Sequence, residues 1–327
     1  MKILLLSNQG MIDGIVGNPI MLRMRDTLKT DPRIEDVEML RCKEPFSVCK
    51  ELRKKAQGVD VIHLHFGGVY ALVVWFLLFG IKKPKIITFH GTDIHAKALN
   101  TAKDWKERLK IRLNQRASFL CIRLYDRCGF VASEMMDYVP GCLRKTLNKK
   151  SFIQRLGVDY NKFIIEDKNK AQAKLNLEIG KYALFSDISG TKIKRRDIAS
   201  LIVRKLGDEY NLLIMCGVNP SVVPDYINAC DFVLLTSDEE GSPNIIREAL
   251  ALNKPVFSVE VGDAVQQLKG LNNSTIISRV PDKAVETIKE YLNKTYIDNS
   301  RETRREIIDF VSCNSEIIDI YESSLTS

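Results

Sequence analysis

The sequence lacks motifs that are typical of several protein classes. Its eight cysteines are scattered and form no Cys-x-x-Cys pair, so we expect reduced thiols rather than a disulfide framework or a structural zinc site. No Asp-x-Asp motif occurs, and His63 and His65 have no third ligand at a suitable spacing, so we expect no metal and no cofactor. The longest apolar run, 69–81, is too short to span a bilayer. A predicted strand at 2–7 stands where a secretory signal would be, which favours a cytoplasmic protein.

What the sequence does contain is a regular alternation of strand and helix patterns. A chain of 327 residues, 45% of them hydrophobic, exceeds what one hydrophobic core usually organises. We therefore predict an α/β protein with two Rossmann-like domains that face each other across a deep cleft. The first domain is expected at 1–163 and the second at 164–305, with the linker inside the polar stretch 159–177. A helix at 306–327 can return to pack on the first domain.

The expected elements follow from the hydrophobic periodicity. In the first half, strands are expected at 2–7, 36–40, 59–64, 84–89, 129–132 and 152–156, and helices at 18–29, 47–56, 69–80, 101–125 and 134–139. In the second half, strands are expected at 182–185, 210–215, 231–236, 255–259 and 274–278, and helices at 195–206, 221–229, 243–252, 281–294 and 301–325.

Two glutamates, Glu240 and Glu248, flank a predicted helix start. Ser242 suits the N-cap and Pro243 the first helical position, so Glu240 lies in the loop and Glu248 about a turn and a half inside the helix. The backbone N–H groups of residues 242–245 lack intrahelical partners and lie at the positive end of the helix dipole, which suits a phosphate group.

The same pattern also begins ordinary surface helices, so its setting decides between the two interpretations. Buried-type strands at 230–237 and 255–259 flank the motif, which places it in a loop between strand and helix. Ligands of open parallel sheets bind at the carboxyl ends of the strands. The setting therefore favours a sugar-nucleotide site, with the diphosphate on the helix start and hydroxyl groups on the carboxylates.

Matches to one enzyme family follow each other in order along most of the chain. In the second half they are Val223-Pro224-Asp225-Tyr226, Ala229-Cys230-Asp231, Glu240, Glu248, Lys254-Pro255-Val256 and Val261-Gly262. In the first half they are Asp60-Val61-Ile62-His63-Leu64-His65-Phe66-Gly67, Ile87-Thr88-Phe89-His90-Gly91-Thr92-Asp93 and Val131-Ala132-Ser133-Glu134. With them the chain resembles the family 4 retaining glycosyltransferases of the GT-B fold (glycosyl transferases group 1), which carry two glutamates with seven residues between them.

The resemblance implies a metal-independent, retaining hexosyltransferase. Such an enzyme moves a sugar from a nucleoside-diphosphate donor to a glycan or lipid-linked acceptor in cell-surface polysaccharide synthesis. The resemblance assigns Glu240 to the hydroxyls of the donor sugar, Glu248 to the ribose and His90 to the transferred sugar. It also implies that the leaving phosphate oxygen accepts the proton of the acceptor. The other donor-binding candidates of the motif are Gly241, Ser242, Pro243, Asn244 and Ile245.

Departure of a nucleoside diphosphate also requires cations or helix N-termini. The segment 190–196 follows a predicted strand where the family has an arginine and a lysine, but the usual glycine is not clearly present and Asp187 stands at the strand end. We favour Lys194 and Arg195 for the diphosphate, with Lys192 as a further candidate. A solvated run of charges remains the other interpretation.

The first half offers further candidates. Gly14 and Gly17 lie in the loop after the first strand and would let backbone N–H groups approach a phosphate or sugar, although the loop is too long for a dinucleotide fingerprint. Asp93 either binds acceptor hydroxyls or caps the following helix. His65 shares a strand face with His63 and is an acceptor-binding candidate.

The net charge of +8 and the pI of about 9.0 raise the question of an anionic partner. Many of the cations fall within a predicted helix at 101–127, where apolar residues lie among them. This helix either contacts acidic lipid headgroups, which would make the protein peripheral at the inner face of the membrane, or is an ordinary solvated helix. We expect no nucleic-acid partner, because no binding module accompanies the charge.

A sugar-nucleotide epimerase or hydrolase of the same fold is the alternative to a transferase. It would turn over a UDP-sugar without an acceptor. A binding-only relative is a third interpretation, and the intact pair of glutamates argues against it.

Overall fold

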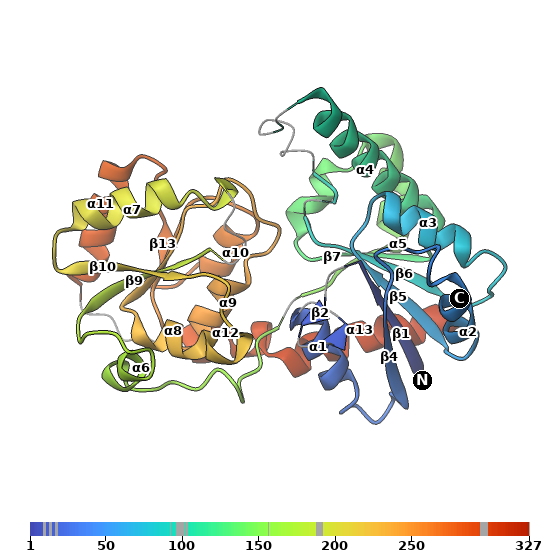
Figure 1. The fold of residues 1–327 in the computed structure, drawn as a ribbon, viewed down its shortest axis with the longest axis horizontal. Coiled ribbons are helices and arrows are strands. Elements are labelled where there is room, and N and C mark those ends of the chain that lie inside the picture. Colours follow the sequence, from blue (N-terminus) through green and yellow to red (C-terminus); the bar gives the residue numbers. More distant parts are fainter. Residues whose placement is uncertain are drawn as a thin grey trace. The chain divides into compact units, whose positions relative to one another are not determined.

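The computed structural model describes residues 1–8, 11–12, 15–16, 19–91, 93–95, 102, 104–155, 157–187, 192–294 and 300–326. The chain divides into two compact units, one formed by Met1–Leu156 with Phe310–Ser327 and the other by Gly157–Asp309 (Figure 1). The predicted second domain, 164–305, is shorter than the observed unit at both ends. The additional residues at the two ends of this unit pair with each other: Val158 forms a β-bridge with Asp309, and the Val158 N–H donates to the Ile308 carbonyl at 2.7 Å.

The first unit is a six-stranded parallel sheet in the order β4-β1-β5-β6-β7-β8. Its strands are β1 (Lys2–Ser7), β4 (Asp36–Arg41), β5 (Val61–His65), β6 (Lys85–Phe89), β7 (Arg127–Phe130) and β8 (Ser151–Ile153). A short hairpin, β2 (Met11–Ile12) with β3 (Ile15–Val16), follows β1. The helices are α1 (Pro19–Leu28), α2 (Cys49–Gln57), α3 (Val69–Leu77), α4 (Trp105–Leu124), α5 (Arg144–Lys150) and α13 (Phe310–Leu325).

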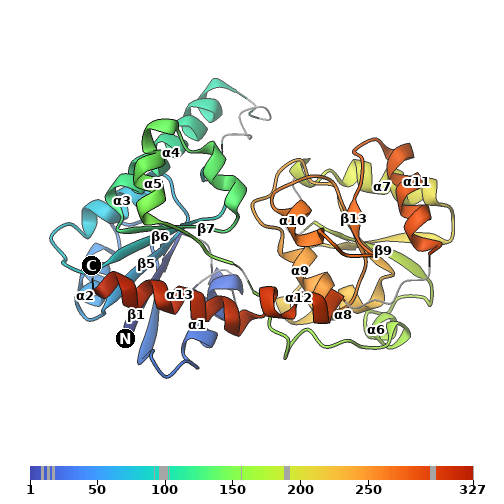
Figure 2. The same ribbon diagram turned by 180° about the vertical axis from the view of Figure 1, so that it is seen from behind.

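Alternation along each strand builds two cores, one on either face of this sheet. Ile3 and Leu5 of β1 face a core that includes α1 and α13, whereas Leu4 and Leu6 face the core under α2, α3, α4 and α5. Figure 2 shows α13 lying beside α1 on its face of the sheet. Both faces are covered, which explains why the strands are almost continuously apolar.

The second unit is a five-stranded parallel sheet in the order β10-β9-β11-β12-β13. Its strands are β9 (Lys181–Ser186), β10 (Tyr210–Met215), β11 (Phe232–Leu235), β12 (Val256–Ser258) and β13 (Thr275–Ile276). Its helices are α6 (Lys168–Lys174), α7 (Arg196–Leu206), α8 (Val223–Ala229), α9 (Asn244–Ala251), α10 (Ala264–Leu268), α11 (Pro281–Leu292) and α12 (Ser300–Ile308). One continuous hydrophobic core joins these helices to the sheet.

Two local predictions were wrong. The linker was expected inside 159–177, but this stretch belongs to the second unit, which begins at Gly157, and it contains the helix α6. Asp167 caps α6 by accepting from the Lys170 N–H at 3.0 Å, and Gln172 donates to the Gly180 and Ala229 carbonyls. The single helix expected at 301–325 is two helices, α12 and α13, because the β-bridge of Asp309 interrupts it.

Both sheets have a topological switch point, where the chain leaves one edge of a central strand and continues on the other. In the second unit the chain runs from β9 to β10 on one side and then to β11 on the other. In the first unit it runs from β1 to β4 and then to β5. Ligands of doubly wound sheets bind outside the carboxyl ends of the strands at this point.

Candidate active site

At the switch point of the second unit, hydrogen bonds connect the loops that follow β9 and β11. The Thr236 hydroxyl, just after β11, donates to the carbonyls of Lys194 and Arg195 at 3.1 and 3.0 Å. The Asp238 N–H donates to the Ile193 carbonyl at 2.8 Å. The basic segment after β9 and the acidic loop after β11 are therefore held together, although more than forty residues separate them.

Glu240 and Lys194 meet at this point. The Lys194 ammonium donates to Glu240 Oε1 at 2.6 Å, and the Ser237 hydroxyl donates to the same oxygen at 2.7 Å. The two charged side chains are only 15% and 22% exposed. Glu240 Oε2 has no hydrogen-bond partner within the described part of the chain. One carboxylate oxygen is thus fixed, and the other remains able to accept hydrogen bonds from a ligand.

The other two predicted cations are placed differently. Arg195 takes a left-handed backbone conformation, φ +55°, which is uncommon for a residue other than glycine. Its guanidinium binds Asp197 at 2.9 Å and Asp238 at 3.3 Å, and the hydrogen bond with Asp197 raises the pKa of the arginine further. Lys192 is exposed on a 3₁₀ turn. Lys194 is therefore the one of the three that contacts Glu240.

The predicted cap of the following helix was wrong. Helix α9 begins at Asn244, and the cap position belongs to Pro243, which makes no side-chain capping bond. The Ser242 hydroxyl instead donates to Asp263 at 2.6 Å and accepts from Arg247 at 2.5 Å. Arg247 is 4% exposed, and such a buried guanidinium requires acceptors close by.

The side chains of Ser242 and Asn244 are consequently turned to Arg247, since Asn244 Oδ1 also accepts from its guanidinium. What the helix start still offers a ligand is its backbone. Asn244 and Ile245 are the first two helical residues, whose N–H groups have no intrahelical acceptor, whereas Pro243 has no N–H to give. Glu248 is the fifth residue of the helix and is 7% exposed.

The carboxyl edge of the first sheet carries a pair of histidines. His65 ends β5 and His90 follows β6, and His65 Nδ1 lies 3.0 Å from His90 Nε2. The ring of Phe66 stacks on His90 with 4.2 Å between the centroids. His65 is fully buried, whereas His90 is partly exposed. His90 is therefore the member of this pair that can reach a ligand, and the buried His65 contacts its ring.

Hydrogen bonding suggests the tautomers of this pair. His65 Nε2 is buried and has no partner among the described residues. A buried N–H without an acceptor is rarer than a buried acceptor without a donor, so we infer that His65 is protonated on Nδ1 and donates to His90 Nε2. Burial lowers the pKa of His90 to about 4, so its ring is neutral near pH 7. The Nδ1 of His90 then carries the proton and can donate to a ligand oxygen.

A second chain of hydrogen bonds joins the neighbouring His63 to the C-terminal helix. His63 Nδ1 lies 2.7 Å from the Tyr321 hydroxyl of α13, and His63 Nε2 lies 2.8 Å from the Thr88 hydroxyl. Thr88 donates in turn to Gln154 Oε1 at 2.5 Å. Burial lowers the pKa of His63 to about 3. The sequence shows no sign of this chain, because Tyr321 is 258 residues from His63.

Asp93 has a structural role. Its carboxylate accepts hydrogen bonds from the N–H groups of Gly67, His90 and Gly91, at 2.7, 3.0 and 2.9 Å, and it is 5% exposed. Burial raises the pKa of Asp93, while the backbone N–H groups act to lower it. This geometry favours a clamp between the loops after β5 and β6 over contact with acceptor hydroxyls. The loop glycines Gly14 and Gly17 lie outside the described residues.

Comparison with known proteins gives distant relatives. No family model matches the chain. It is 23% identical over 289 residues to an uncharacterized glycosyltransferase of Methanocaldococcus jannaschii, with 82% of this chain and 76% of the relative covered. It is also 23% identical over 269 residues to TuaC of Bacillus subtilis, whose name describes a glycosyltransferase of teichuronic acid biosynthesis. That match covers 75% of this chain and 64% of TuaC, so the chain spans less than two thirds of TuaC.

Solved structures resemble both units together. HepE of Anabaena in complex with UDP-glucose superposes with a TM-score of 0.73 at 16% identity, over 99% of this chain and all of HepE. The chain has the GT-B fold. The UDP-GlcNAc 2-epimerase of Neisseria meningitidis superposes less closely, with a TM-score of 0.59 at 11% identity over 99% of this chain and 100% of the epimerase. The prediction of two Rossmann-like domains with the GT-B fold is thereby confirmed.

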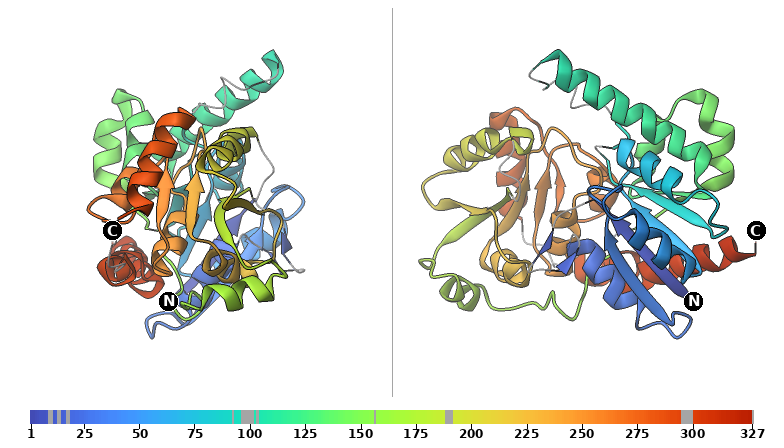
Figure 3. Two further views of the ribbon diagram at one scale, coloured as in Figure 1. Left: turned by 90° about the vertical axis from the view of Figure 1, so that its left-hand side faces the viewer. Right: turned by 45° about the vertical axis from the view of Figure 1, so that its right-hand side comes forward.

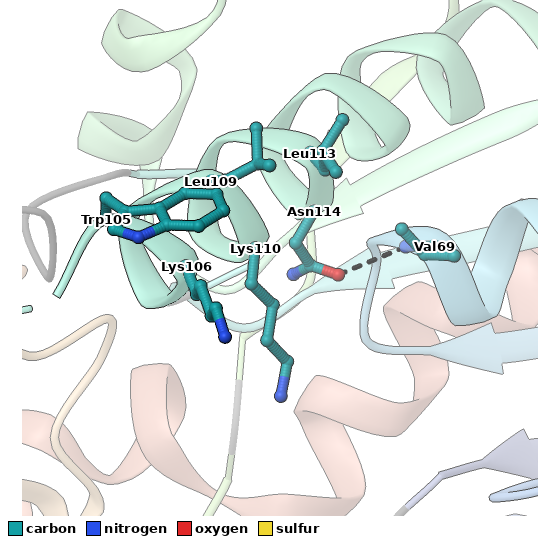
Figure 4. A pocket seen from close by; sticks show the side chains of 7 residues that line it. All are labelled: Val69, Trp105, Lys106, Leu109, Lys110, Leu113 and Asn114. Atoms are coloured by element: carbon teal, nitrogen blue, oxygen red, sulfur yellow. Dashed lines mark hydrogen bonds between the residues drawn. The ribbon is translucent and has the colours of Figure 1, made fainter.

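Helix α4 of this GT-B chain begins at Trp105 and is capped by Asp104, which accepts from the Glu107 N–H at 2.8 Å. The predicted helix at 101–127 therefore starts later and ends earlier. Helix α4 has 20 residues, and Figure 3 shows it projecting from its unit. Within the part of the chain that is described, no helix is both long and apolar enough to cross a membrane. Figure 4 shows the groove of about 490 Å³ beside it, lined by Val69, Trp105, Lys106, Leu109, Lys110, Leu113 and Asn114.

Several residues at the carboxyl edge of the second sheet were not predicted. Arg279, which follows β13, binds Asp238 at 3.1 Å and donates to the Ser237 carbonyl at 3.0 Å. Ser237 and Asp238 directly follow the predicted strand 231–236, and this position alone indicated that they lie at the ligand-binding edge of the sheet. Arg247 had no sequence signal, because its partner Asp263 lies in a different loop.

Replacing Gly262 by alanine should displace the loop that carries Glu240. Gly262 has φ +52°, and a Cβ there would lie 2.4 Å from the Gly241 carbonyl oxygen. We expect a loss of about 1–3 kcal/mol in the free energy of unfolding and weaker nucleotide-sugar binding, measured by urea unfolding and calorimetry. Gly217→Ala is the matched control, because Gly217 has φ +61° with nothing within 4 Å of its added Cβ. Equal effects of the two substitutions on binding would contradict this role.

Acid should destabilise the protein through its buried histidines. His63 and His65 have folded-state pKa values lowered by burial, so the unfolded chain takes up their protons first as the pH falls below about 6.5. Their stabilising contribution is complete above that pH and is lost as the pH falls, for His63 on the way down to about pH 3. Each contributes up to about 1.4 kcal/mol per pH unit. Urea unfolding at several pH values should give a smaller slope for His63→Gln, and an unchanged slope would refute the assignment.

Proposed function

We propose that the protein is a retaining glycosyltransferase that moves a hexose-type sugar from a nucleoside-diphosphate sugar to a glycan or lipid-linked acceptor in cell-surface polysaccharide synthesis. The observation that carries this proposal is the contact between Lys194 and Glu240 at the switch point of the second sheet. A cation for a diphosphate and a carboxylate for sugar hydroxyls are thereby held side by side. HepE in complex with UDP-glucose and the names of the two curated relatives support a nucleotide-sugar donor, with UDP as the first base to test.

In this proposal the donor lies along the carboxyl edge of the second sheet. The diphosphate meets the Lys194 ammonium and the N–H groups of Asn244 and Ile245 at the start of α9. Glu240 Oε2 accepts hydrogen bonds from the hydroxyls of the donor sugar, and Glu248 holds the ribose. Gly241 and Lys192 complete the proposed donor contacts, and Arg195 is the alternative to Lys194 for the diphosphate.

The chemistry needs a stabilised leaving group. As the bond between the anomeric carbon and the phosphate oxygen breaks, negative charge grows on the diphosphate, where Lys194 and the helix start stabilise it without a metal ion. The acceptor hydroxyl attacks from the same face and gives its proton to the leaving phosphate oxygen, so the configuration is retained. Neutral His90 donates a hydrogen bond from Nδ1 to a hydroxyl of the transferred sugar, and His65 positions it.

A lipid-linked acceptor would bring the enzyme to the inner face of the membrane from the cytoplasm. Trp105, Leu109 and Leu113 are 69%, 48% and 50% exposed on α4, next to Lys106 and Lys110. Exposed apolar residues flanked by cations suit an acidic bilayer surface. The start of α3 contacts this helix, since the Val69 N–H donates to Asn114 Oδ1 at 3.1 Å.

Neutralising the exposed Arg112, Arg116 and Arg123 should weaken membrane attachment. Each cation near an anionic surface contributes about 1 kcal/mol, so the triple glutamine variant should partition to phosphatidylglycerol vesicles roughly a hundredfold less. Cosedimentation with vesicles measures this, and vesicles of phosphatidylcholine are the control. Unchanged cosedimentation would remove this helix from membrane binding.

The alternative function is a sugar-nucleotide epimerase or hydrolase, which the similarity to the UDP-GlcNAc 2-epimerase favours. One experiment separates the two functions. The purified protein is incubated with UDP-glucose with and without a lipid-linked glycan acceptor, and the products are resolved by chromatography. We expect glycosylated acceptor and little turnover without it. Epimerised or hydrolysed sugar in the absence of an acceptor would favour the alternative.

A further inference from the structure

A second concentration of positive charge lies on the opposite edge of the first sheet. A cavity of about 670 Å³ opens where β6, β7 and β8 begin, at the amino ends of the strands, whereas His65 and His90 lie at the carboxyl ends. We name it the basic cavity; it is lined by Lys82, Lys83, Pro84, Lys85, Asp126, Arg127, Lys149, Lys150, Ser324 and Leu325. Six cations and one carboxylate give this lining a formal charge of +5, in a chain whose net charge is +8.

The described residues leave most of the charge of the basic cavity without a counter-ion. Lys85 and Lys150 direct their ammonium groups to backbone carbonyls, as in the contact of Lys150 with the Tyr125 carbonyl at 2.7 Å. Asp126 accepts from the Lys85 backbone N–H at 2.8 Å. Among the described residues, none of the six cations forms an ion pair. Like charges without counter-ions repel one another and destabilise the folded protein, and a bound polyanion would relieve this repulsion.

Exposed aromatic side chains shortly precede the first lysines of the basic cavity in sequence. Phe76 and Phe79 are 60% and 69% exposed at the end of α3. Phe79 is three residues before Lys82, so the chain keeps the two within about 10 Å. Arg53 fixes this turn by donating to the Leu77 and Phe79 carbonyls at 2.6 and 3.2 Å. Aromatic rings held outward beside lysines are typical of surfaces that meet a lipid headgroup layer.

We propose that the basic cavity binds phosphate groups at a site separate from the donor site. The phosphate comes from an anionic lipid headgroup or from a soluble phosphorylated compound, and the two sources share the same chemistry: several ammonium and guanidinium groups around a multiply charged oxyanion. The exposed phenylalanines favour the lipid source.

The test is the variant Lys82→Gln, Lys83→Gln, Lys149→Gln, which removes three ammonium groups that form no hydrogen bond or ion pair with the described residues. The control removes three lysines from elsewhere on the same unit, in the variant Lys43→Gln, Lys50→Gln, Lys54→Gln. Thermal unfolding with pyrophosphate probes a soluble ligand, and cosedimentation with phosphatidylglycerol vesicles probes a lipid. Because each lysine near an anionic surface strengthens partitioning about fivefold, we expect the first variant to bind vesicles roughly a hundredfold more weakly.

The outcomes separate the sources. Loss of vesicle binding in the first variant alone supports a lipid headgroup, and loss of the pyrophosphate shift alone supports a soluble phosphate. The donor site can also bind pyrophosphate, but that response is common to all three proteins and cancels in the comparison. An unchanged first variant, or an equal loss in the control variant, overturns the proposal.

Discussion

Glu240→Gln should lower kcat/KM for sugar transfer by about a hundredfold to a thousandfold, the range found when one charge-stabilising group is removed from an active site. Glutamine keeps the volume of the side chain and can still accept from Ser237 through its amide oxygen, so the loop should hold its place. What is lost is the negative charge at Oε2, the oxygen that remains open to a ligand, and the charge that balances Lys194 at 2.6 Å.

The measurement for this prediction is steady-state release of nucleoside diphosphate with the acceptor present. Glu260→Gln is a matched control, because Glu260 is an exposed carboxylate that follows β12 at the same edge of the sheet. The control should retain the activity of the unsubstituted protein within a few-fold. Activity of Glu240→Gln at the level of the control would remove Glu240 from the mechanism.

Lys194→Met should weaken donor binding by about tenfold to a hundredfold and lower kcat as well. Methionine retains the aliphatic stem but cannot donate a charge-assisted hydrogen bond, which contributes about 1.5–3 kcal/mol. The effect on kcat follows because charge on the diphosphate grows as the leaving group departs. Calorimetry with a nucleotide sugar measures the affinity, and turnover measures kcat.

Arg195→Gly is the comparison that identifies the cation. Glycine accepts the φ of +55° without strain, and the ion pairs that it removes, with Asp197 and Asp238, are largely exposed and contribute little. We expect this variant to bind the donor within a few-fold of the unsubstituted protein. Strong loss in Arg195→Gly together with normal binding in Lys194→Met would assign the diphosphate to Arg195.

The parts of this protein that follow from local pattern were predictable. Continuous apolar runs such as 182–185 and 231–236 form the central strands of the second sheet, and the acidic motif stands at their carboxyl edge. The cap at Ser242 was wrong because local pattern could not show the buried Arg247 that competes for its hydroxyl.

The remaining errors also have tertiary causes. Which loop meets which depends on strand order, and only that order brings Lys194 to Glu240. Arg279, which follows β13, binds Asp238, which follows β11, although the two residues are far apart in sequence. Tyr321 of the last helix likewise contacts His63 of β5. Asp93 could be read as a cap or as a ligand residue until its three backbone donors were known.

The most direct measurement of the donor site is thermal unfolding with UDP, GDP and their sugar conjugates, on the unsubstituted protein and on Lys194→Met. A ligand at about a hundred times its Kd stabilises the folded state by about 2.7 kcal/mol, which raises the unfolding midpoint by several degrees. We predict that at least one nucleotide sugar gives such a shift in the unsubstituted protein and a much smaller one in Lys194→Met. No shift with any nucleotide sugar, or equal shifts in both proteins, would contradict a nucleotide-sugar site built around Lys194 and Glu240.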